Sequence, residues 1–114
     1  MSDENYKTIL VSKSKGVLKV TLNRPHELNA LSWEMRKELE DCFTKSENDA
    51  SVRAVLITGG DYVFSAGMDI KEISSLPDGE IDDYFKSITS YLLKIYLFKK
   101  PVVAAVGGIA LGGG

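Results

Sequence analysis

Two short apolar runs that enclose one amphipathic segment constrain the fold of this chain more than any other feature. The runs are VRAVLIT at 52–58 and VVAAV at 102–106, and both are bounded by turn residues or proline. Strands joined through a helix pair in parallel by a crossover, so this order predicts a parallel β-α-β unit with both strands covered on two faces. The residues between them that fall on one helical face are Ile81, Tyr84, Phe85, Ile88, Tyr91, Leu92 and Ile95.

The limits of this helix follow from its flanking residues. Asp78 and Gly79 precede it, and Lys99 and Lys100 lie beyond its last apolar turn. Lysines suit the negative end of a helix dipole, and Pro101 cannot continue a helix. The pattern therefore predicts a helix over about 81–98.

The N-terminal half predicts an antiparallel entry to this unit. The apolar runs TILVS and VLKVTL flank KSKG, whose Gly16 suits a tight turn, so residues 8–22 are expected to form a hairpin. NRPHELNALS at 23–32 is expected to be a loop, and Ser32 is a suitable N-cap for a helix to about residue 46. The expected fold class is α/β. The apolar face of the first helix would comprise Met35, Leu39, Cys42 and Phe43.

Composition and charge indicate one domain without a nucleic-acid or membrane surface. The 114 residues carry a net charge of −2 and include one Cys and one His. No disulfide and no Cys/His metal cluster can form within the chain, and the low cysteine content fits a reducing compartment. The start MSDENYK has no secretory or transit pattern, and the apolar stretch from residue 101 is too short to span a bilayer. We therefore expect a cytoplasmic protein with no membrane or nucleic-acid partner.

Each strand of the predicted crossover runs into a glycine-bearing segment. These are TGGDYVFSAGMDI at 58–70 and VGGIALGGG at 106–114. The carboxyl ends of parallel strands meet at one edge of a sheet, so the two loops could each direct a backbone N–H group at one oxygen, as in an oxyanion hole. The alternative is that both are plain turns, and spacing alone does not decide. Neither loop has the lysine or the glycine spacing of a phosphate-binding motif. Ser65 does not stand in the G-x-S-x-G motif that carries the nucleophile of serine hydrolases, which argues against that class of enzyme.

Asp69 and Glu72 are three residues apart and could form a carboxylate pair for acid–base chemistry. The stronger interpretation is structural: Asp69 caps a short helix over 70–75, and Glu72 lies on its first exposed turn. Lys71, between them, could meet an anionic ligand but is expected to be solvated.

Three other residues have structural interpretations. His26 is expected on the surface of a loop, and Cys42 is expected to be a small core residue. Trp33 could bind a ligand, although packing is the favoured role.

Three segments together resemble the crotonase superfamily, the enoyl-CoA hydratases and isomerases. They are LNRPHELNALS at 22–32, AVLITGGDYVFSAGMDIKEI at 54–73 and KPVVAAVGGIALGGG at 100–114, and their order and separation match as well. The resemblance covers nearly the whole chain. It implies a crotonase-like spiral of β-β-α units, with residues 1–114 forming the N-terminal part of a single domain, and assembly as a homotrimer or hexamer.

The resemblance also implies an acyl-CoA thioester as substrate, with no separate cofactor and no metal. The thioester carbonyl would lie between the backbone N–H groups of Met68 and Gly113, with the small residues before Met68 allowing a close approach. Met68 holds a position that is often alanine, so its larger side chain would alter the acyl pocket. The segments 28–30 and 66–71 resemble those that hold the adenine and pantetheine of CoA. The substrate contacts implied are Leu28, Ala30, Ala66, Gly67, Met68, Asp69, Ile70, Lys71, Gly112 and Gly113.

The sequence departs from the family in its acid–base groups. In hydratases the catalytic glutamates follow the second glycine loop, and no residue among the 114 matches either. We expect an enzyme of acyl-CoA and fatty acid metabolism, with hydration, isomerisation, hydrolysis and carbon–carbon cleavage all open. The alternatives are a non-catalytic acyl-CoA-binding or assembly module that ends at Gly114, and a nucleotide-binding protein. The 114 residues alone are expected to show no turnover and to associate through the open edge of the last strand.

Overall fold

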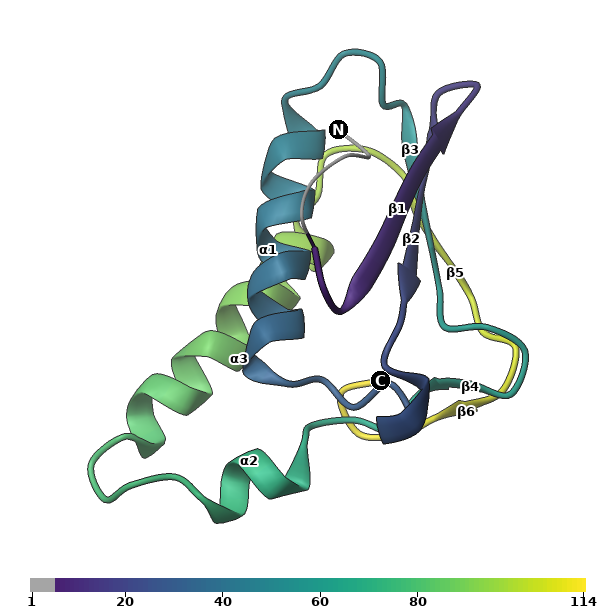
Figure 1. Cartoon of the computed structure of the whole chain (residues 1–114). Helices are drawn as coiled ribbons and strands as arrows, with labels where there is room; N and C mark the ends of the chain where they lie inside the picture. Colours follow the sequence, from purple (N-terminus) through teal and green to yellow (C-terminus); the bar gives the residue numbers. More distant parts are fainter. Residues whose placement is uncertain (1–5) are drawn as a thin grey trace.

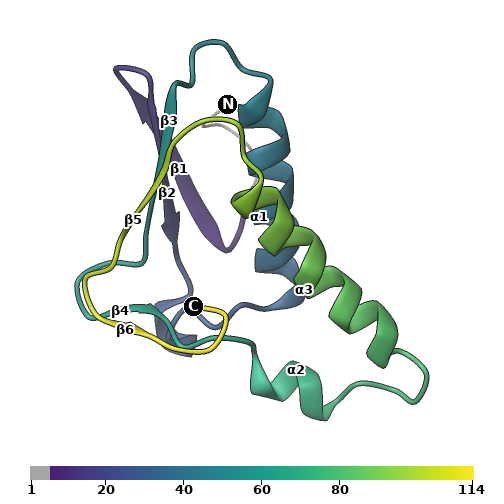
Figure 2. The ribbon, with the colours of Figure 1, turned by 180° about the vertical axis from the view of Figure 1, so that it is seen from behind.

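A computed structural model describes residues 6–114 as a mixed four-stranded sheet with helices packed against it (Figure 1). Both long helices, α1 and α3, lie on the same side of the sheet, as the reverse view also shows (Figure 2). Positions 1–5, part of the start for which no secretory or transit pattern is predicted, lie outside the described residues. No helix among residues 6–114 is long and apolar enough to cross a membrane.

The predicted hairpin is confirmed. Strands β1 (Ile9–Ser14) and β2 (Val17–Leu22) pair antiparallel with Ile9 opposite Leu22. The turn between them uses left-handed backbone at Lys15 (φ 53°) and at Gly16 (φ 83°), which glycine adopts at little cost. Because side chains alternate along β2, Leu18, Val20 and Leu22 all enter the core.

The parallel crossover is also confirmed. Strand β3 (Ala54–Thr58) pairs in parallel with β5 (Val102–Ala105), and α3 (Ile81–Tyr96) connects them. The strand order β1-β2-β3-β5 places β5 at the edge, as expected for a strand with one unpaired side. The expectation that both strands are covered on two faces is wrong, because both long helices lie on one side of the sheet. On the other side, Val103 of β5 is 58% exposed and Leu56 of β3 is only half-buried.

Helix α1 (Trp33–Glu47) follows its prediction closely. The Ser32 hydroxyl oxygen accepts a hydrogen bond from the Met35 N–H group at 3.2 Å, which caps the helix as expected. The predicted apolar face is wholly buried, and its members are Met35, Leu39, Cys42 and Phe43.

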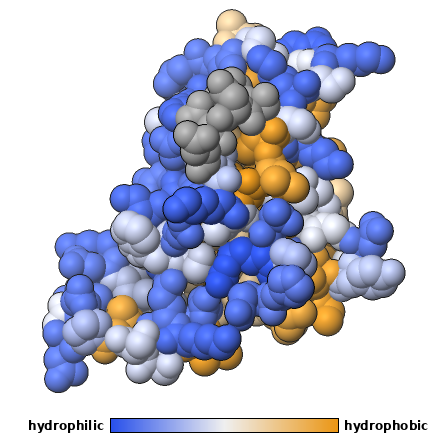
Figure 3. Space-filling model, in the orientation of Figure 1, coloured by the Kyte–Doolittle hydropathy of each residue, from blue (hydrophilic) through white to orange (hydrophobic). Residues whose placement is uncertain are grey.

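Helix α3 turns its predicted apolar face toward the core, but only part of that face is buried. Tyr91 is buried, and Ile88 and Ile95 pack against the core. Ile81, Phe85 and Leu92 remain exposed, because α3 packs mainly against α1, along one side of the helix. On the face shown in Figure 3, hydrophilic side chains predominate and apolar ones show mainly over the sheet.

The predicted glycine loops contain two short strands that the sequence did not reveal. Strand β4 (Val63–Ser65) and strand β6 (Ile109–Ala110) pair in parallel as a second, two-stranded sheet. Runs this short cannot show an alternation of apolar and polar residues. The loop at 23–32 likewise contains a 3-10 turn, η1 (Pro25–Glu27), and the short helix α2 spans Ile70–Ser74.

Candidate functional site

The two glycine loops pack directly against each other. Beyond the β4–β6 pair, the Leu111 N–H group donates to the Ser65 carbonyl oxygen at 3.0 Å. A methyl group added at Gly67 would lie 2.8 Å from the Leu111 carbonyl oxygen, and the φ of Gly67 is 100°. Gly67 is therefore required for contact between the loops, a role that the sequence analysis did not identify.

This contact places Met68 beside Gly113. A methyl group added at Gly113 would lie 2.5 Å from the terminal carbon of the Met68 side chain. The backbone N–H groups of Met68 and Gly113 donate no hydrogen bond to any acceptor within residues 6–114. Two free amide donors therefore stand on adjoining loops.

The loop that carries Met68 is held by the segment that precedes α1. The Leu31 N–H group donates to the Gly67 carbonyl oxygen at 2.8 Å, and the Ala66 N–H group donates to the Leu28 carbonyl oxygen at 3.0 Å. The segments 28–30 and 66–71, predicted to share a ligand, are thus brought together.

Asn29 fixes the same junction and was missed as a functional position. It is 1% exposed and left-handed, with a φ of 54°. Its side-chain oxygen accepts from the Arg24 N–H group at 2.7 Å, and its amide nitrogen donates to the carbonyl oxygens of Gly59 (3.0 Å) and Phe64 (3.1 Å). Asparagine is among the few residues that tolerate this conformation, which is the signal that could have identified it.

Asp69 has the predicted capping role. Its carboxylate accepts hydrogen bonds from the N–H groups of Lys71 (3.0 Å) and Glu72 (3.4 Å) at the start of α2. It also pairs with Arg24 at 3.3 Å. The carboxylate is therefore occupied by structural partners.

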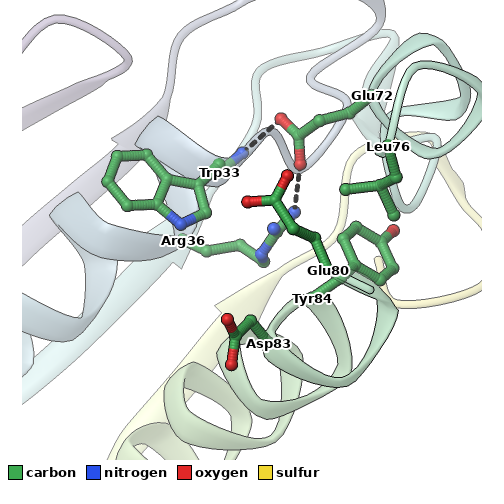
Figure 4. Close-up of a pocket in the computed structure, with 7 residues that line it drawn as sticks. All are labelled: Trp33, Arg36, Glu72, Leu76, Glu80, Asp83 and Tyr84. Carbon is green, nitrogen blue, oxygen red and sulfur yellow. Dashed lines mark hydrogen bonds and ion pairs between the residues drawn. The ribbon is translucent and has the colours of Figure 1, made fainter. Parts of the chain in front are cut away.

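The expectation that Glu72 lies on an exposed turn is wrong. Its carboxylate accepts a hydrogen bond from the Trp33 N–H group at 2.6 Å and lies 3.0 Å from the Arg36 guanidinium (Figure 4). The Arg36 contact is an ion pair without the alignment of a hydrogen bond, so the Glu72 oxygen that faces Arg36 accepts no hydrogen bond from residues 6–114. The sequence did not show that α2 would meet α1, which is why this pair was missed.

Arg36 joins three elements from within the core. It is 1% exposed, and its guanidinium donates to the Leu31 carbonyl oxygen at 2.7 Å and to the Ser87 hydroxyl at 3.0 Å. The guanidinium also lies over the Tyr84 ring, 5.1 Å from its centroid. A buried cation needs partners of this kind, so Arg36 links α1, α2 and α3 around a pocket of about 210 Å³ (Figure 4).

Trp33 lies at the rim of this pocket rather than packed in the core. It is 54% exposed, and the Lys37 ammonium lies 4.7 Å from its ring centroid. The favoured packing role is therefore wrong. His26 is exposed and Cys42 is buried, as predicted.

The remaining implied contacts surround the Met68 loop. Leu28 and Ile70 are exposed apolar residues, and Ala30 is half-buried. Lys71 is exposed and pairs with Glu27 at 3.3 Å. The loop thus has apolar and basic side chains on its accessible side.

A second cavity, of about 230 Å³, borders Gly113 on the inner side of the loops. Its walls are mostly apolar and include Leu31, Phe64 and Ile95, and Tyr91 projects from α3. Burial raises the pKa of Tyr91 to about 12, only partly offset by the nearby Arg36 charge. No group of three or more His, Cys, Asp or Glu side chains within residues 6–114 could hold a metal ion.

Known proteins similar to this chain belong to one enzyme family. The profile of the enoyl-CoA hydratase/isomerase family matches residues 12–114. A Mycobacterium leprae protein described as a probable enoyl-CoA hydratase, echA8, is 43% identical over 96% of this chain and 42% of its own length. The mitochondrial Delta(3,5)-Delta(2,4)-dienoyl-CoA isomerase of Mus musculus is 36% identical over the whole of this chain and 38% of its own length.

A solved structure shows the same fold. The enoyl-CoA hydratase from Bacillus anthracis superposes with a TM-score of 0.89 at 34% identity, over 95% of this chain and 43% of that one. The chain thus spans less than half the length of the relatives that it matches, and it aligns with their N-terminal part. By sequence profile and by fold, the chain belongs to the enoyl-CoA hydratase/isomerase family of the crotonase superfamily.

Proposed function

We propose that the protein binds an acyl-CoA thioester and stabilises its enolate in an oxyanion hole made by the backbone N–H groups of Met68 and Gly113. The observation that supports this is that both groups are free donors on two loops in mutual contact. The loops are fixed by backbone hydrogen bonds and by the Asn29 side chain, so the donors need little reorganisation.

The chemistry follows from the acidity of the thioester. Removing a proton from the carbon next to the carbonyl moves negative charge onto the carbonyl oxygen. Two fixed donors would each stabilise this charge by about 3–4 kcal/mol. Asp69 and Glu72 are occupied by Arg24 and Arg36, so neither is proposed as the catalytic base.

Binding of the CoA moiety is proposed at the accessible side of the Met68 loop. Leu28, Ala30 and Ile70 offer apolar surface, and Lys71 carries a positive charge there. With Ala66, Asp69 and the glycines of both loops, these residues form the proposed substrate site. We further propose that CoA enters as part of the substrate with no other cofactor, and that the complete protein is a cytoplasmic trimer or hexamer of fatty acid metabolism.

Calorimetry on the protein expressed from its complete coding sequence tests this function. Crotonyl-CoA and acetyl-CoA are expected to bind, whereas ATP, which shares the adenine nucleotide but lacks pantetheine and thioester, is expected to bind far more weakly. Equal or tighter binding of ATP would contradict the proposal. Binding of crotonyl-CoA without any turnover would favour a non-catalytic acyl-CoA-binding protein instead.

A further inference from the structure

The hydroxyl group of Tyr91 is a buried polar group on α3. Tyr91 is 2% exposed, and its ring packs in the core with Leu31 and Leu39 among others. Its hydroxyl oxygen has no hydrogen-bond partner within residues 6–114. Leaving a buried hydroxyl unpaired costs about 1–3 kcal/mol. A phenylalanine would fill the same space without this cost, so the oxygen itself needs an explanation.

The position of this hydroxyl indicates a ligand. It lies 3.2 Å from where a methyl group on Gly113 would be, so it stands directly beside the residue whose amide is a free donor. The cavity of about 230 Å³ lies between α3 and the loops and is bordered by Tyr91, Gly113 and Gly114 together. An acyl group held at the Gly113 amide would therefore lie close to the Tyr91 hydroxyl.

We propose that the Tyr91 hydroxyl is a third hydrogen-bond donor to the thioester carbonyl oxygen, beside the amides of Met68 and Gly113. This inference rests on the function proposed above. It adds a side-chain donor from α3 to the two backbone donors of the proposed oxyanion hole. The phenol donates a hydrogen bond and keeps its proton throughout, so no bond to hydrogen breaks at Tyr91. As charge moves onto the carbonyl oxygen, this hydrogen bond strengthens and stabilises the enolate.

The surroundings of Tyr91 suit a donor that stays protonated. Burial raises its pKa to about 12, so the hydroxyl is neutral over the whole physiological range. The walls of the cavity are mostly apolar, and a hydrogen bond is electrostatically stronger there than in water. Arg36, whose charge acts on Tyr91, donates to the Leu31 carbonyl oxygen and the Ser87 hydroxyl and pairs with Glu72.

The chain offers a matched control in Tyr84. This tyrosine lies on the same helix, and its hydroxyl is also buried without a hydrogen-bond partner among the described residues. It faces the Arg36 pocket, however, and not the cavity beside Gly113 (Figure 4). Tyr84→Phe therefore removes the same atom from the same helix without touching the proposed carbonyl site.

The test compares Tyr91→Phe and Tyr84→Phe with the unmodified protein, each expressed from the complete coding sequence. The probe is a 2,4-dienoyl-CoA, whose conjugated absorption band shifts to longer wavelength when its carbonyl oxygen accepts hydrogen bonds. We expect Tyr91→Phe to reduce this shift and to lower kcat on crotonyl-CoA by about 10- to 100-fold, with KM nearly unchanged and with Tm equal to or above that of the unmodified protein. Tyr84→Phe is expected to leave the band and kcat as they are.

A second variant keeps the test decisive if Tyr91→Phe does not fold. Replacement of Tyr91 with 3,5-difluorotyrosine keeps the hydroxyl and makes it a stronger donor, so the band is expected to shift further to the red. An unchanged band and kcat in either folded variant would overturn the role of Tyr91. A dienoyl-CoA that binds the unmodified protein without any shift would instead contradict the oxyanion hole itself.

Discussion

Replacing Gly67 with alanine is expected to destabilise the protein by about 2–5 kcal/mol and to weaken acyl-CoA binding. Two costs add. A left-handed backbone costs alanine about 1–2 kcal/mol, and the φ of Gly67 is 100°. The new methyl group would also lie 2.8 Å from the Leu111 carbonyl oxygen, which belongs to the backbone of the second loop. Overpacking of this kind costs about 1–3 kcal/mol and would move the loop that carries Gly113 away from Met68.

Gly60→Ala is the matched control for this change. The φ of Gly60 is 105°, almost the same as at Gly67, but a methyl group there would meet no atom within 4 Å. Denaturant unfolding of both variants therefore separates backbone strain from the clash between loops. Equal losses of stability in the two variants would show that the contact between the glycine loops is not what requires Gly67.

Replacing Arg36 with methionine is expected to cost about 3–5 kcal/mol of stability. The change leaves the Glu72 carboxylate without its cation and removes the donors to the Leu31 carbonyl oxygen and the Ser87 hydroxyl. Removing Arg36 is costly because it leaves the half-buried Glu72 carboxylate with no cation and with only the Trp33 N–H group as a partner. Unfolding with urea, followed by far-UV circular dichroism, measures the loss.

The double variant Arg36→Met/Glu72→Gln provides the control. It removes both charges, while the glutamine oxygen can still accept from the Trp33 N–H group. It is expected to be more stable than Arg36→Met alone. If the double variant lost as much stability as the sum of the two single variants, the pair would not be coupled in the way that the structure indicates.

The parts of the fold that were predictable are those with a periodic sequence signal. Alternation in β2 and the helical spacing from Met35 to Phe43 each reflect burial of one face, and both predictions are confirmed. The cap at Asp69 was predictable because it depends on residues next to it in sequence. Local rules of this kind do not need the tertiary structure.

The parts that were missed depend on contacts between distant segments. The pair between Arg36 and Glu72 forms only when the first turns of α1 and α2 are brought together. The Asn29 side chain likewise bonds segments 30 or more residues away. Strands β4 and β6 are set by pairing between the two glycine loops, which no short window of sequence reports. The proposed site residues themselves came from the resemblance to a family and stay predictions.

The most direct test of the proposed oxyanion hole is the infrared frequency of a bound thioester carbonyl. Crotonyl-CoA labelled with carbon-13 at that carbonyl would be bound to the protein expressed from its complete coding sequence, and the difference spectrum recorded against unlabelled ligand. Hydrogen bonds from the Met68 and Gly113 amides would draw electrons onto the carbonyl oxygen and weaken the double bond. The account therefore predicts a carbonyl stretch at lower frequency than for the same thioester in water. A bound thioester with the frequency that it has in water, or a higher one, would contradict it.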